Sequence, residues 1–296
     1  MAYLSSKAVG TLIRVQESGA NVNYEIAGFN AHGAGLATLV RKDLRGTSAF
    51  GGNTNYIGST LDTLCNTTIF ATFPEELKRI IQEVTLTLAT SSTTSTTIQR
   101  KCFALSYTEV GFGNNGSIAE NAALSRYNSN ANRIKTNGGS AAIWWLRSLN
   151  VSDTSIVRGV NTDGTASYYN PSKAYGVAPA FVLRSDVIIS DTANADGSFN
   201  IMYASKIDVK IKAAEYSDRP EAVRVLLSHN GVLNALQVCN NFNDASPTWE
   251  AATKGEEHEF TNNTKTAAKW AVAIWVDVRR TGTEKIYIDE PVVMVR

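Results

Sequence analysis

Strict alternation of apolar and polar residues is the feature that most limits how the last third of this chain can fold. The runs 206–212 and 223–227 place an apolar residue at every second position, and 270–278 keeps one continuous apolar face. Because successive side chains of a strand point to opposite faces, a period of two indicates strands with one buried face. No helical spacing competes there, so we expect 200–296 to form an all-β antiparallel sandwich domain.

The preceding residues predict a different domain, which we place at 1–192. Short strands are expected early in it, at 12–15, 24–26 and 36–40, each bounded by Gly and Asn residues that favour turns. Further on, the segment 161–164 contains Asp-Gly between two apolar runs, which favours a β-hairpin. The run 177–183 predicts the strand that closes this domain, and 191–197 predicts a linker or a turn.

Two helices are expected between residues 59 and 84, so the fold class of the first domain is α+β with mixed short strands. Ser59 is a candidate N-cap for the first helix. The second begins at Pro74 and has acidic residues in its first turn, and its apolar residues Leu77, Ile80, Ile81 and Val84 follow helical spacing. The run 84–88 alternates like a strand, the hydroxyl-rich tract 90–97 predicts an exposed loop, and 118–126 has a weak helical pattern.

Charge and cysteine content restrict the partners. Twenty-eight basic and 27 acidic residues give a net charge of +1 without a polybasic block, so we expect no nucleic-acid binding. No apolar run approaches the roughly 20 residues that cross a bilayer, and we expect no membrane insertion. Three separated cysteines and the absence of a signal peptide predict a protein made in a reducing cytoplasm.

Motifs for catalysis, cofactors and metals are weak throughout the chain. The glycine-rich segment 111–116 matches G-x-G-x-x-G, but the acidic residue that a dinucleotide site needs about 20 positions later is missing. The three histidines stand in unrelated segments, and no G-x-S-x-G motif occurs. We therefore predict no cofactor, no metal, no catalytic residue and no enzyme. A carboxylate pair for glycoside hydrolysis stays open, because such pairs converge only in space.

The aromatic and polar segment 168–175 is the most site-like stretch. Aromatic faces bury sugar or protein surface at a small entropy cost, and Asn and Lys add adaptable hydrogen bonds. The candidate ligand-binding residues are Arg147, Asp163, Tyr168, Tyr169, Asn170, Lys173 and Tyr175. The structural alternatives are an ordinary hairpin end and, for Arg147, a buried ion pair with Asp153 or Asp163. The adjacent Trp144 and Trp145 would point to opposite faces of a strand and serve as scaffold.

Three neighbouring motifs carry a family resemblance: Trp-Trp-Leu-Arg-Ser at 144–148, the segment 159–164 and the strand 175–183. They resemble an uncharacterised "WWLRSP" domain of phage and prophage proteins of Gram-positive bacteria, over roughly residues 8–187. The chain departs from that pattern at Leu149, where the family has Pro, and at Ala178, where it has Arg. The resemblance implies a fold similar to C-type lectins and to the formylglycine-generating enzyme, whose oxidase chemistry is not implied because paired cysteines are missing.

The second domain resembles the C-terminal β-sandwich of phage minor structural proteins, through 243–250 and 260–267. Together the two resemblances imply a virion protein, assembled in the host bacterial cytoplasm, in a tail or baseplate. Its expected partners are other virion proteins, further copies of itself in a trimer, and host surface glycan. A capsid decoration or head-fibre protein without a receptor role is the alternative, followed by a particle-borne glycan hydrolase.

Overall fold

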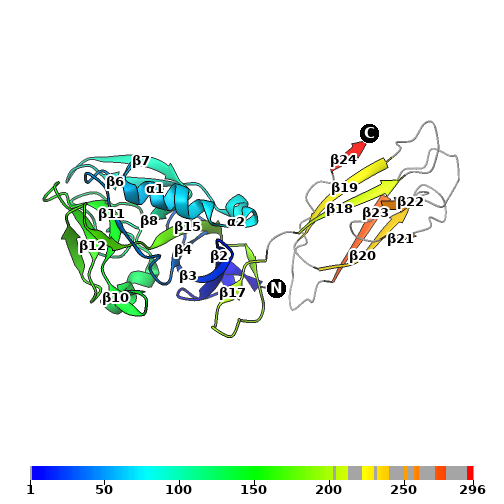
Figure 1. Ribbon diagram of the computed structural model, residues 1–296, viewed down its shortest axis with the longest axis horizontal. Helices are drawn as coiled ribbons and strands as arrows, with labels where there is room; N and C mark the ends of the chain where they lie inside the picture. Colours follow the sequence, from blue (N-terminus) through cyan, green and yellow to red (C-terminus); the bar gives the residue numbers. More distant parts are fainter. Residues whose placement is uncertain are drawn as a thin grey trace. The chain divides into compact units, whose positions relative to one another are not determined.

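The structure, a computed structural model, describes residues 2–202 in full and, beyond them, the backbone of seven strands between 205 and 295. The described residues divide into two compact units (Figure 1), one of them Ala2–Ile201 and the other beginning at Met202. Strands dominate both units and helices are few and short, so the fold is β-rich.

The N-terminal unit is built on a six-stranded sheet in the order β17-β2-β3-β4-β15-β8. Its strands are β2 (Leu12–Glu17), β3 (Ala20–Phe29), β4 (Leu36–Arg41), β8 (Cys102–Ala104), β15 (Pro179–Arg184) and β17 (Phe199–Asn200). The first three confirm the strands expected early in the chain, and β15 confirms the closing strand. All pairs are antiparallel except β17 with β2.

A second sheet of five strands carries the tryptophan pair, in the order β13-β12-β11-β14-β5. Its strands are β5 (Thr47–Ala49), β11 (Trp144–Leu149), β12 (Val157–Val160), β13 (Ala166–Tyr169) and β14 (Ala174–Gly176). The expected hairpin is confirmed, because β12 and β13 pair on either side of the Asp-Gly turn. This places β13 at the edge of the sheet.

Three short antiparallel pairs complete the strands of this unit: β6 (Val84–Ala89) with β7 (Ser95–Arg100), β9 (Lys135–Asn137) with β10 (Ser140–Ala142), and β1 (Ala2–Tyr3) with β16 (Ile188–Ile189). The prediction of a loop over 90–97 was wrong for its last three residues, which are part of β7. The sequence favours this outcome, because Thr suits an exposed strand paired with an alternating partner.

The two expected helices form, but the second is shorter than the sequence predicts. α1 (Thr60–Thr63) begins behind Ser59, whose hydroxyl accepts from the Asp62 backbone N–H, and a π-helical stretch (Leu64–Ile69) follows it. α2 (Glu75–Ile80) ends before Ile81 turns extended, so its predicted continuation to Val84 was wrong. Val84 is still buried, but as the first residue of β6, which confirms the strand that the alternation over 84–88 predicts. Burial on a strand therefore accounts for an apolar position that matched helical spacing.

Three other helical segments are a single turn each: α3 (Asn130–Arg133) and two 3-10 turns, Leu4–Ser6 and Ser125–Tyr127. The weak helical pattern over 118–126 was therefore wrong except at its end. The residues before Ser125 are held by polar contacts instead of helix bonds, as the contacts of Glu120 illustrate.

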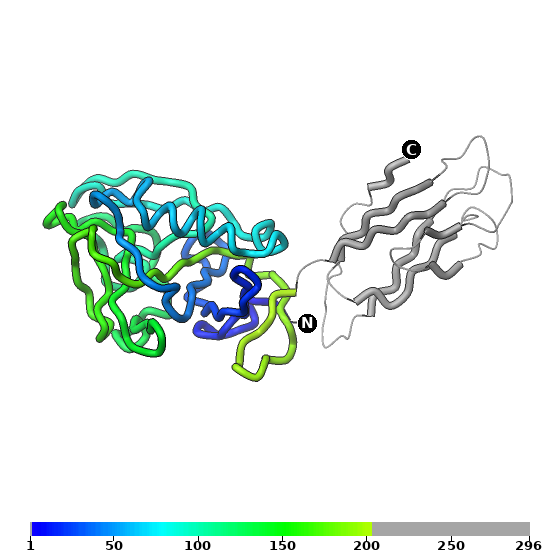
Figure 2. Tube along the Cα trace, in the orientation of Figure 1, coloured from blue at the N-terminus to red at the C-terminus, as the bar shows by residue number. Residues whose placement is uncertain are grey.

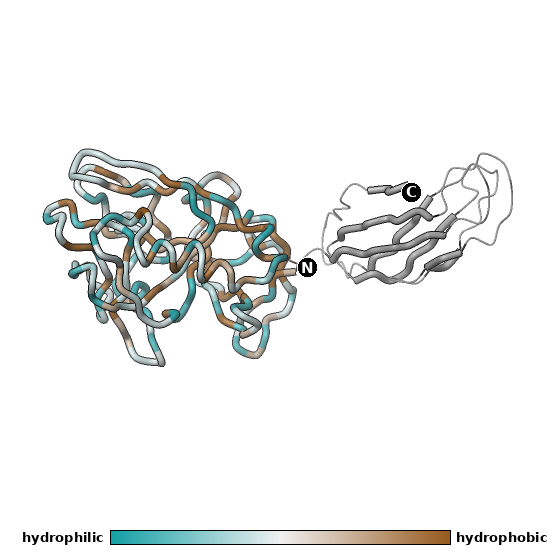
Figure 3. The backbone as a smooth tube through the Cα atoms, turned by 45° about the horizontal axis from the view of Figure 1, so that its top comes forward, coloured by the Kyte–Doolittle hydropathy of each residue, from teal (hydrophilic) through white to brown (hydrophobic). Residues whose placement is uncertain are grey.

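The segment 191–197 is a turn that folds back on the six-stranded sheet, and it is not a linker. Asp196 accepts hydrogen bonds from Arg14 and Asn23, and Phe199 then pairs beside β2. The tube in Figure 2 shows this yellow-green segment next to the blue N-terminal strands. In the same unit, brown hydrophobic stretches run along the strands between paler or teal residues (Figure 3), as expected for sheets with buried faces.

The second unit contains seven described strands in two sheets. One has the order β22-β18-β19-β24 and the other β21-β20-β23. The strands are β18 (Ser205–Lys212), β19 (Ala222–His229), β20 (Val232–Cys239), β21 (Glu250–Ala252), β22 (Glu257–Glu259), β23 (Ala271–Asp277) and β24 (Val292–Val295). Their pairs are antiparallel except β18 with β22. Most of 243–250 and all of 260–267, which carry the second resemblance, lie outside the described residues.

Candidate functional site

The tryptophan pair is scaffold. Trp144 and Trp145 are fully buried on β11, and their rings point to opposite faces of the five-stranded sheet, as alternation requires. The Trp144 indole N–H donates to the Arg133 carbonyl at 3.0 Å, and the Trp145 indole N–H donates to the Ser48 carbonyl at 2.9 Å. With each indole N–H satisfied inside the protein, neither ring is left to meet a ligand.

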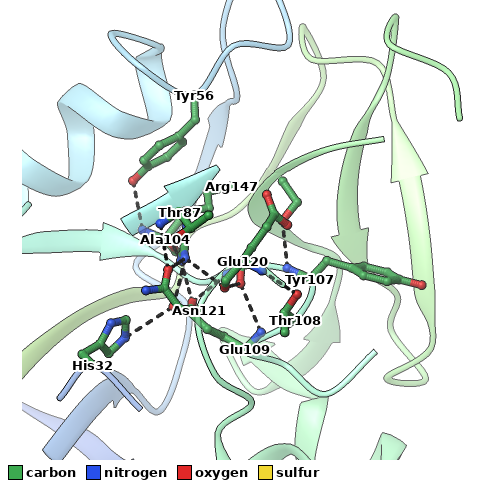
Figure 4. A network of polar contacts seen from close by, with 12 residues as sticks. His32, Tyr56, Thr87, Ala104, Tyr107, Thr108, Glu109, Glu120, Asn121 and Arg147 are labelled. Carbon is green, nitrogen blue, oxygen red and sulfur yellow. Dashed lines mark hydrogen bonds and ion pairs between the residues drawn. The ribbon is translucent and has the colours of Figure 1, made fainter. Parts of the chain in front are cut away.

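Arg147 lies at the centre of a buried network (Figure 4). Its Nη1 and Nη2 donate to the two carboxylate oxygens of Glu109, at 2.5 and 2.9 Å, and neither side chain is exposed. Nη1 also donates to the Ala104 carbonyl, and Nη2 to the Asn121 side-chain oxygen. The predicted alternative of a buried ion pair is therefore confirmed, but the predicted acid was wrong.

The two acids proposed as partners of Arg147 lie in surface turns. Asp153 accepts from the Ser155 backbone and hydroxyl, and Asp163 accepts in the same way from Thr165. These bonds stabilise the ionised carboxylates and lower the pKa of both below its ordinary value. Each acid is thus used by its own turn, and Arg147 finds its carboxylate 38 residues away in the sequence.

Two further titratable groups belong to the buried network. Glu120 accepts from the Ser148 hydroxyl and from the Ala89 backbone N–H, and burial raises its pKa. His32 is buried with its Nε2 3.4 Å from a carboxylate oxygen of Glu109, and burial lowers its pKa. No sequence motif pointed to these residues, because they come from separate loops and meet only in the folded core.

A pocket of about 310 Å³ lies beside this network, at the small end of the range of about 300–1,000 Å³ for ligand pockets. Its lining includes Thr54, Tyr56, Leu88, Leu149 and Arg147. Arg147 has one buried donor without a partner, Nε, but its charge is already neutralised by Glu109. The pocket therefore offers neutral hydroxyl and apolar surface.

Tyr169 and Tyr175 cover the Trp145 face of the sheet. Their ring centroids are 4.5 Å apart, and each packs against the Trp145 ring, at 6.1 and 5.1 Å. Tyr169 reaches Trp145 across Gly159, where a Cβ would lie 3.1 Å from the tyrosine ring. The Tyr169 hydroxyl donates to the Asn161 side chain. The structure therefore brings the predicted residues Tyr169 and Tyr175 together, but both are half-buried and cover the core.

Tyr168 points to the other face of the sheet. It lies on edge strand β13 directly opposite Arg158 of β12, and 56% of it is exposed. Directly opposed residues of an antiparallel pair have Cβ atoms about 5 Å apart, so the two side chains leave the sheet side by side on the same face. Alternation separates Tyr168 from Tyr169, although the sequence prediction treated them as one site.

A stack of rings and cations supports Arg158. Its guanidinium carbon lies 4.5 Å from the centroid of the Tyr107 ring, and that ring packs on Phe112 at 5.2 Å. The guanidinium of Arg133 lies over Phe112 at 4.3 Å. Figure 4 shows the Tyr107 ring pointing away from the buried network. We define Arg158, Tyr107 and Tyr168 as the hairpin surface.

The other predicted residues form the adjoining turns. Asp163 belongs to the turn between β12 and β13, and Asn170 accepts from the Ser172 backbone and hydroxyl in the turn before β14. Lys173 is exposed in that second turn. The structure therefore divides the seven predicted residues between the buried network, the Trp145 face, the hairpin surface and two turns.

One known protein family matches the N-terminal unit. The sequence model of a family described as a domain of unknown function (DUF6273) matches residues 35–185, about half of the chain. The chain belongs to the DUF6273 family. No curated protein and no solved structure matches it. The matched residues of the DUF6273 domain include the tryptophan pair, the buried network except His32, all seven predicted contact residues and the whole hairpin surface.

In the part of the chain that the structure describes, no group of three or more His, Cys, Asp and Glu side chains is arranged to hold a metal ion. None of the helices in that part of the chain is long and apolar enough to cross a membrane. Sequence reasoning missed Arg158 and Tyr107 of the DUF6273 domain. The sequence could have pointed to Arg158, because this residue lies in the predicted hairpin. Only the strand register shows that Tyr168, and not Tyr169, is its partner on the next strand.

Proposed function

We propose that this chain is a structural and receptor-binding component of a bacteriophage particle, in its tail or baseplate, and that its DUF6273 domain binds host surface glycan. The resemblance of 141–186 and of the second domain to phage proteins supports the particle. The exposure of Tyr168 on an edge strand supports binding, and this observation carries the proposal.

The hairpin surface suits a saccharide for physical reasons. An exposed aromatic ring can bury the apolar face of a sugar and has few torsions to order on binding. Tyr168 is the most exposed large apolar side chain among the described residues, which otherwise bury their aromatic rings at least in part. Its strand is paired with β12 and ends next to turns rich in hydrogen-bonding groups. A ring presented on a rigid strand keeps the entropy cost of binding low.

The rest of the proposal follows the two resemblances. The DUF6273 domain takes a C-type-lectin-like fold and faces outward, and the C-terminal unit is an antiparallel β-sandwich that attaches to other virion proteins and forms a trimer. Assembly takes place in the host bacterial cytoplasm. The chain binds its glycan without a catalytic step.

A binding experiment tests the glycan ligand. The full chain is applied to immobilised bacterial surface polysaccharides, beside Tyr168→Ala and the control Ile57→Ala. Ile57 is 39% exposed and lines the pocket near Arg147, so it matches Tyr168 as an exposed apolar residue elsewhere. We expect Tyr168→Ala to lose binding and Ile57→Ala to keep it. The reverse result would assign binding to the pocket, and no binding by the wild type would refute the glycan proposal.

Locating the chain in a particle and measuring its mass test the other parts of the proposal, the position in the tail or baseplate and the trimer. Labelled antibody against the chain should mark the tail or baseplate of intact particles, and sedimentation should give three times the chain mass. Marking of the capsid, without glycan binding, would favour the decoration alternative. Release of new reducing ends from the polysaccharide would overturn the absence of catalysis and favour the hydrolase.

A further inference from the structure

Arg158 differs from the other arginines of the N-terminal unit in its partners. Most of them bond to carboxylates, as Arg41 does to Glu17 and Arg100 to Asp62, while Arg133 donates to backbone carbonyls. No carboxylate of the described residues lies within ion-pair distance of Arg158. Arg133 and Arg79 also lack a carboxylate partner, but Arg133 donates to backbone carbonyls and Arg79 is exposed on α2. Arg158 is therefore a half-buried cation without a counter-charge in the described part of the chain.

The surroundings hold the Arg158 guanidinium in place without using its terminal donors. The Tyr107 ring supports one flat face of the group, and the Tyr107 ring is itself backed by Phe112. Contact with a ring face leaves the N–H groups, which lie in the guanidinium plane, pointing sideways. The buried Nε has no partner either. Such a group is ordered in advance of binding.

Acidic residues close in the sequence do not supply the missing charge. Asp153 and Asp163 flank β12, and each accepts both of its recorded hydrogen bonds from its own turn. An oxyanion from outside the protein would gain the two parallel N–H···O bonds that a guanidinium offers, which are charge-assisted and therefore strong. Tyr168, directly opposite across the strand pair, would lie against the rest of the same ligand.

We propose that Arg158 and Tyr168 form a binding site for a sugar that carries a phosphate or a carboxylate group. The guanidinium binds the oxyanion and the phenol ring covers the apolar face of the sugar. This inference rests on the proposed glycan binding, because it names the chemical class of the ligand at the same hairpin surface. Charge is what distinguishes it: a neutral glycan would satisfy the proposed function but would leave Arg158 unpaired.

The test measures binding of the full chain to three probes: an oligosaccharide of hexuronates, a polymer of phosphate-linked sugars and a neutral oligosaccharide of similar length. We expect at least one anionic probe to bind about tenfold or more tightly than the neutral one, with an affinity that falls as salt rises. The probe that binds identifies whether the oxyanion is a carboxylate or a phosphate.

Three variants assign the effect to this site. Arg158→Gln should weaken anionic binding about tenfold or more, and Arg158→Lys should recover only part of it, because an ammonium cannot make the two parallel bonds. The matched control Arg79→Gln removes the same charge from an exposed helix and should leave binding unchanged. Unfolding curves check that each variant is folded, and Arg158→Lys keeps the test valid if the glutamine variant is not.

The outcomes separate the two proposals. Equal binding of neutral and anionic probes, unchanged in Arg158→Gln, overturns this inference and leaves glycan binding standing. An equal loss in Arg79→Gln and Arg158→Gln also overturns it, because net charge alone would then explain the binding. If none of these probes and no bacterial polysaccharide binds the wild type, both proposals fall.

Discussion

Arg147 and Arg158 stand on neighbouring strands of the same sheet, and the protein uses them in opposite ways. Arg147 is fully buried, and both terminal nitrogens of its guanidinium donate to partners, Glu109 above all. Arg158 is half-buried, rests on a tyrosine ring and has no carboxylate among the described residues. The two side chains have the same chemistry, yet one guanidinium is paired with a carboxylate inside the core and the other is half-buried without one.

The difference shows what burial demands of a charge. A guanidinium removed from water costs several kcal/mol unless a carboxylate and further acceptors replace the water, so Arg147 must be surrounded by partners. Arg158 keeps contact with solvent and needs no such shell. An arginine in a family motif can therefore be structural, and an arginine outside the motif can be the one that binds. Four changes test this contrast, from the largest expected effect to the smallest.

Removing the buried guanidinium has the largest effect. Arg147→Met leaves the Glu109 carboxylate buried without its partner, which costs about 3–5 kcal/mol of unfolding free energy. Arg158→Met loses only the contact with Tyr107 and costs less than about 1 kcal/mol. Urea unfolding of the two variants measures both values.

A double variant distinguishes lost charge pairing from lost packing. Arg147→Met combined with Glu109→Leu removes both charges, so it should cost clearly less than the sum of the two single variants. If the single losses simply add, or if Arg158→Met costs as much as Arg147→Met, the contrast between the arginines is refuted.

The turn that sets the hairpin register comes second. A Cβ at Gly164 would lie 2.0 Å from the Asn130 carbonyl oxygen, and φ there is +81°. Gly164→Ala should therefore cost about 2–4 kcal/mol, from positive φ and from the clash together, and should weaken any binding at Tyr168. Gly139 has φ +85° and no atom within 4 Å, so Gly139→Ala should cost only about 1 kcal/mol. Equal costs in thermal unfolding would show that the Asn130 contact is irrelevant.

The pH dependence that His32 gives to stability is third, and His32 lies on the Arg147 side. Burial lowers the pKa of His32 from its ordinary 6.5. As pH falls below 6.5 the unfolded chain binds a proton that the folded protein does not, so stability decreases in that window until the lowered pKa is reached. The slope is at most about 1.4 kcal/mol per pH unit. His32→Gln should remove this decrease, which urea curves at pH 7.5, 6.5 and 5.5 would measure against the wild type.

A variant of the hairpin surface serves as the control for this pH measurement. Tyr168→Phe changes no group that titrates near pH 6, so its stability curve should run parallel to that of the wild type. If His32→Gln also runs parallel, His32 takes up its proton equally in both states and the burial argument is wrong.

The smallest effect concerns the ring under Arg158. Tyr107→Leu keeps an apolar side chain but removes the cation–π contact, at a cost of about 0.5–1 kcal/mol. Because the Arg158 guanidinium would then be ordered less well, the affinity for an anionic sugar should fall. The preference for anionic over neutral sugars should remain. Calorimetric titration of the variant measures both. Full affinity in Tyr107→Leu would mean that Arg158 needs no support.

Local patterns determined many elements of this protein in advance. Short runs bounded by Gly and Asn predicted the strands around 12–15, 24–26 and 36–40, Asp-Gly predicted the hairpin, and Ser59 caps the helix that follows it. Each of these depends on neighbours within a few residues, which is why the sequence sufficed. The extension of the second helix to Val84 failed because burial against the core, on β6, overrode helical spacing.

The candidate site was harder to predict from the sequence, because a shift of one residue in the strand register changes which side chains share a face. Val160 pairs with Ala166, and the Asn161 N–H donates to the Thr165 carbonyl, so the loop inside them has three residues, 162–164, with Gly164 at positive φ. A two-residue loop would pair Arg158 with Tyr169 and reverse the faces of both tyrosines. The sequence by itself determined that a β-rich chain carries a hairpin with two tyrosines and nearby arginines. Only the tertiary structure decided that Arg147 meets Glu109 in the core while Arg158 stands beside Tyr168 on the surface, because register and long-range packing depend on contacts between residues far apart in the chain.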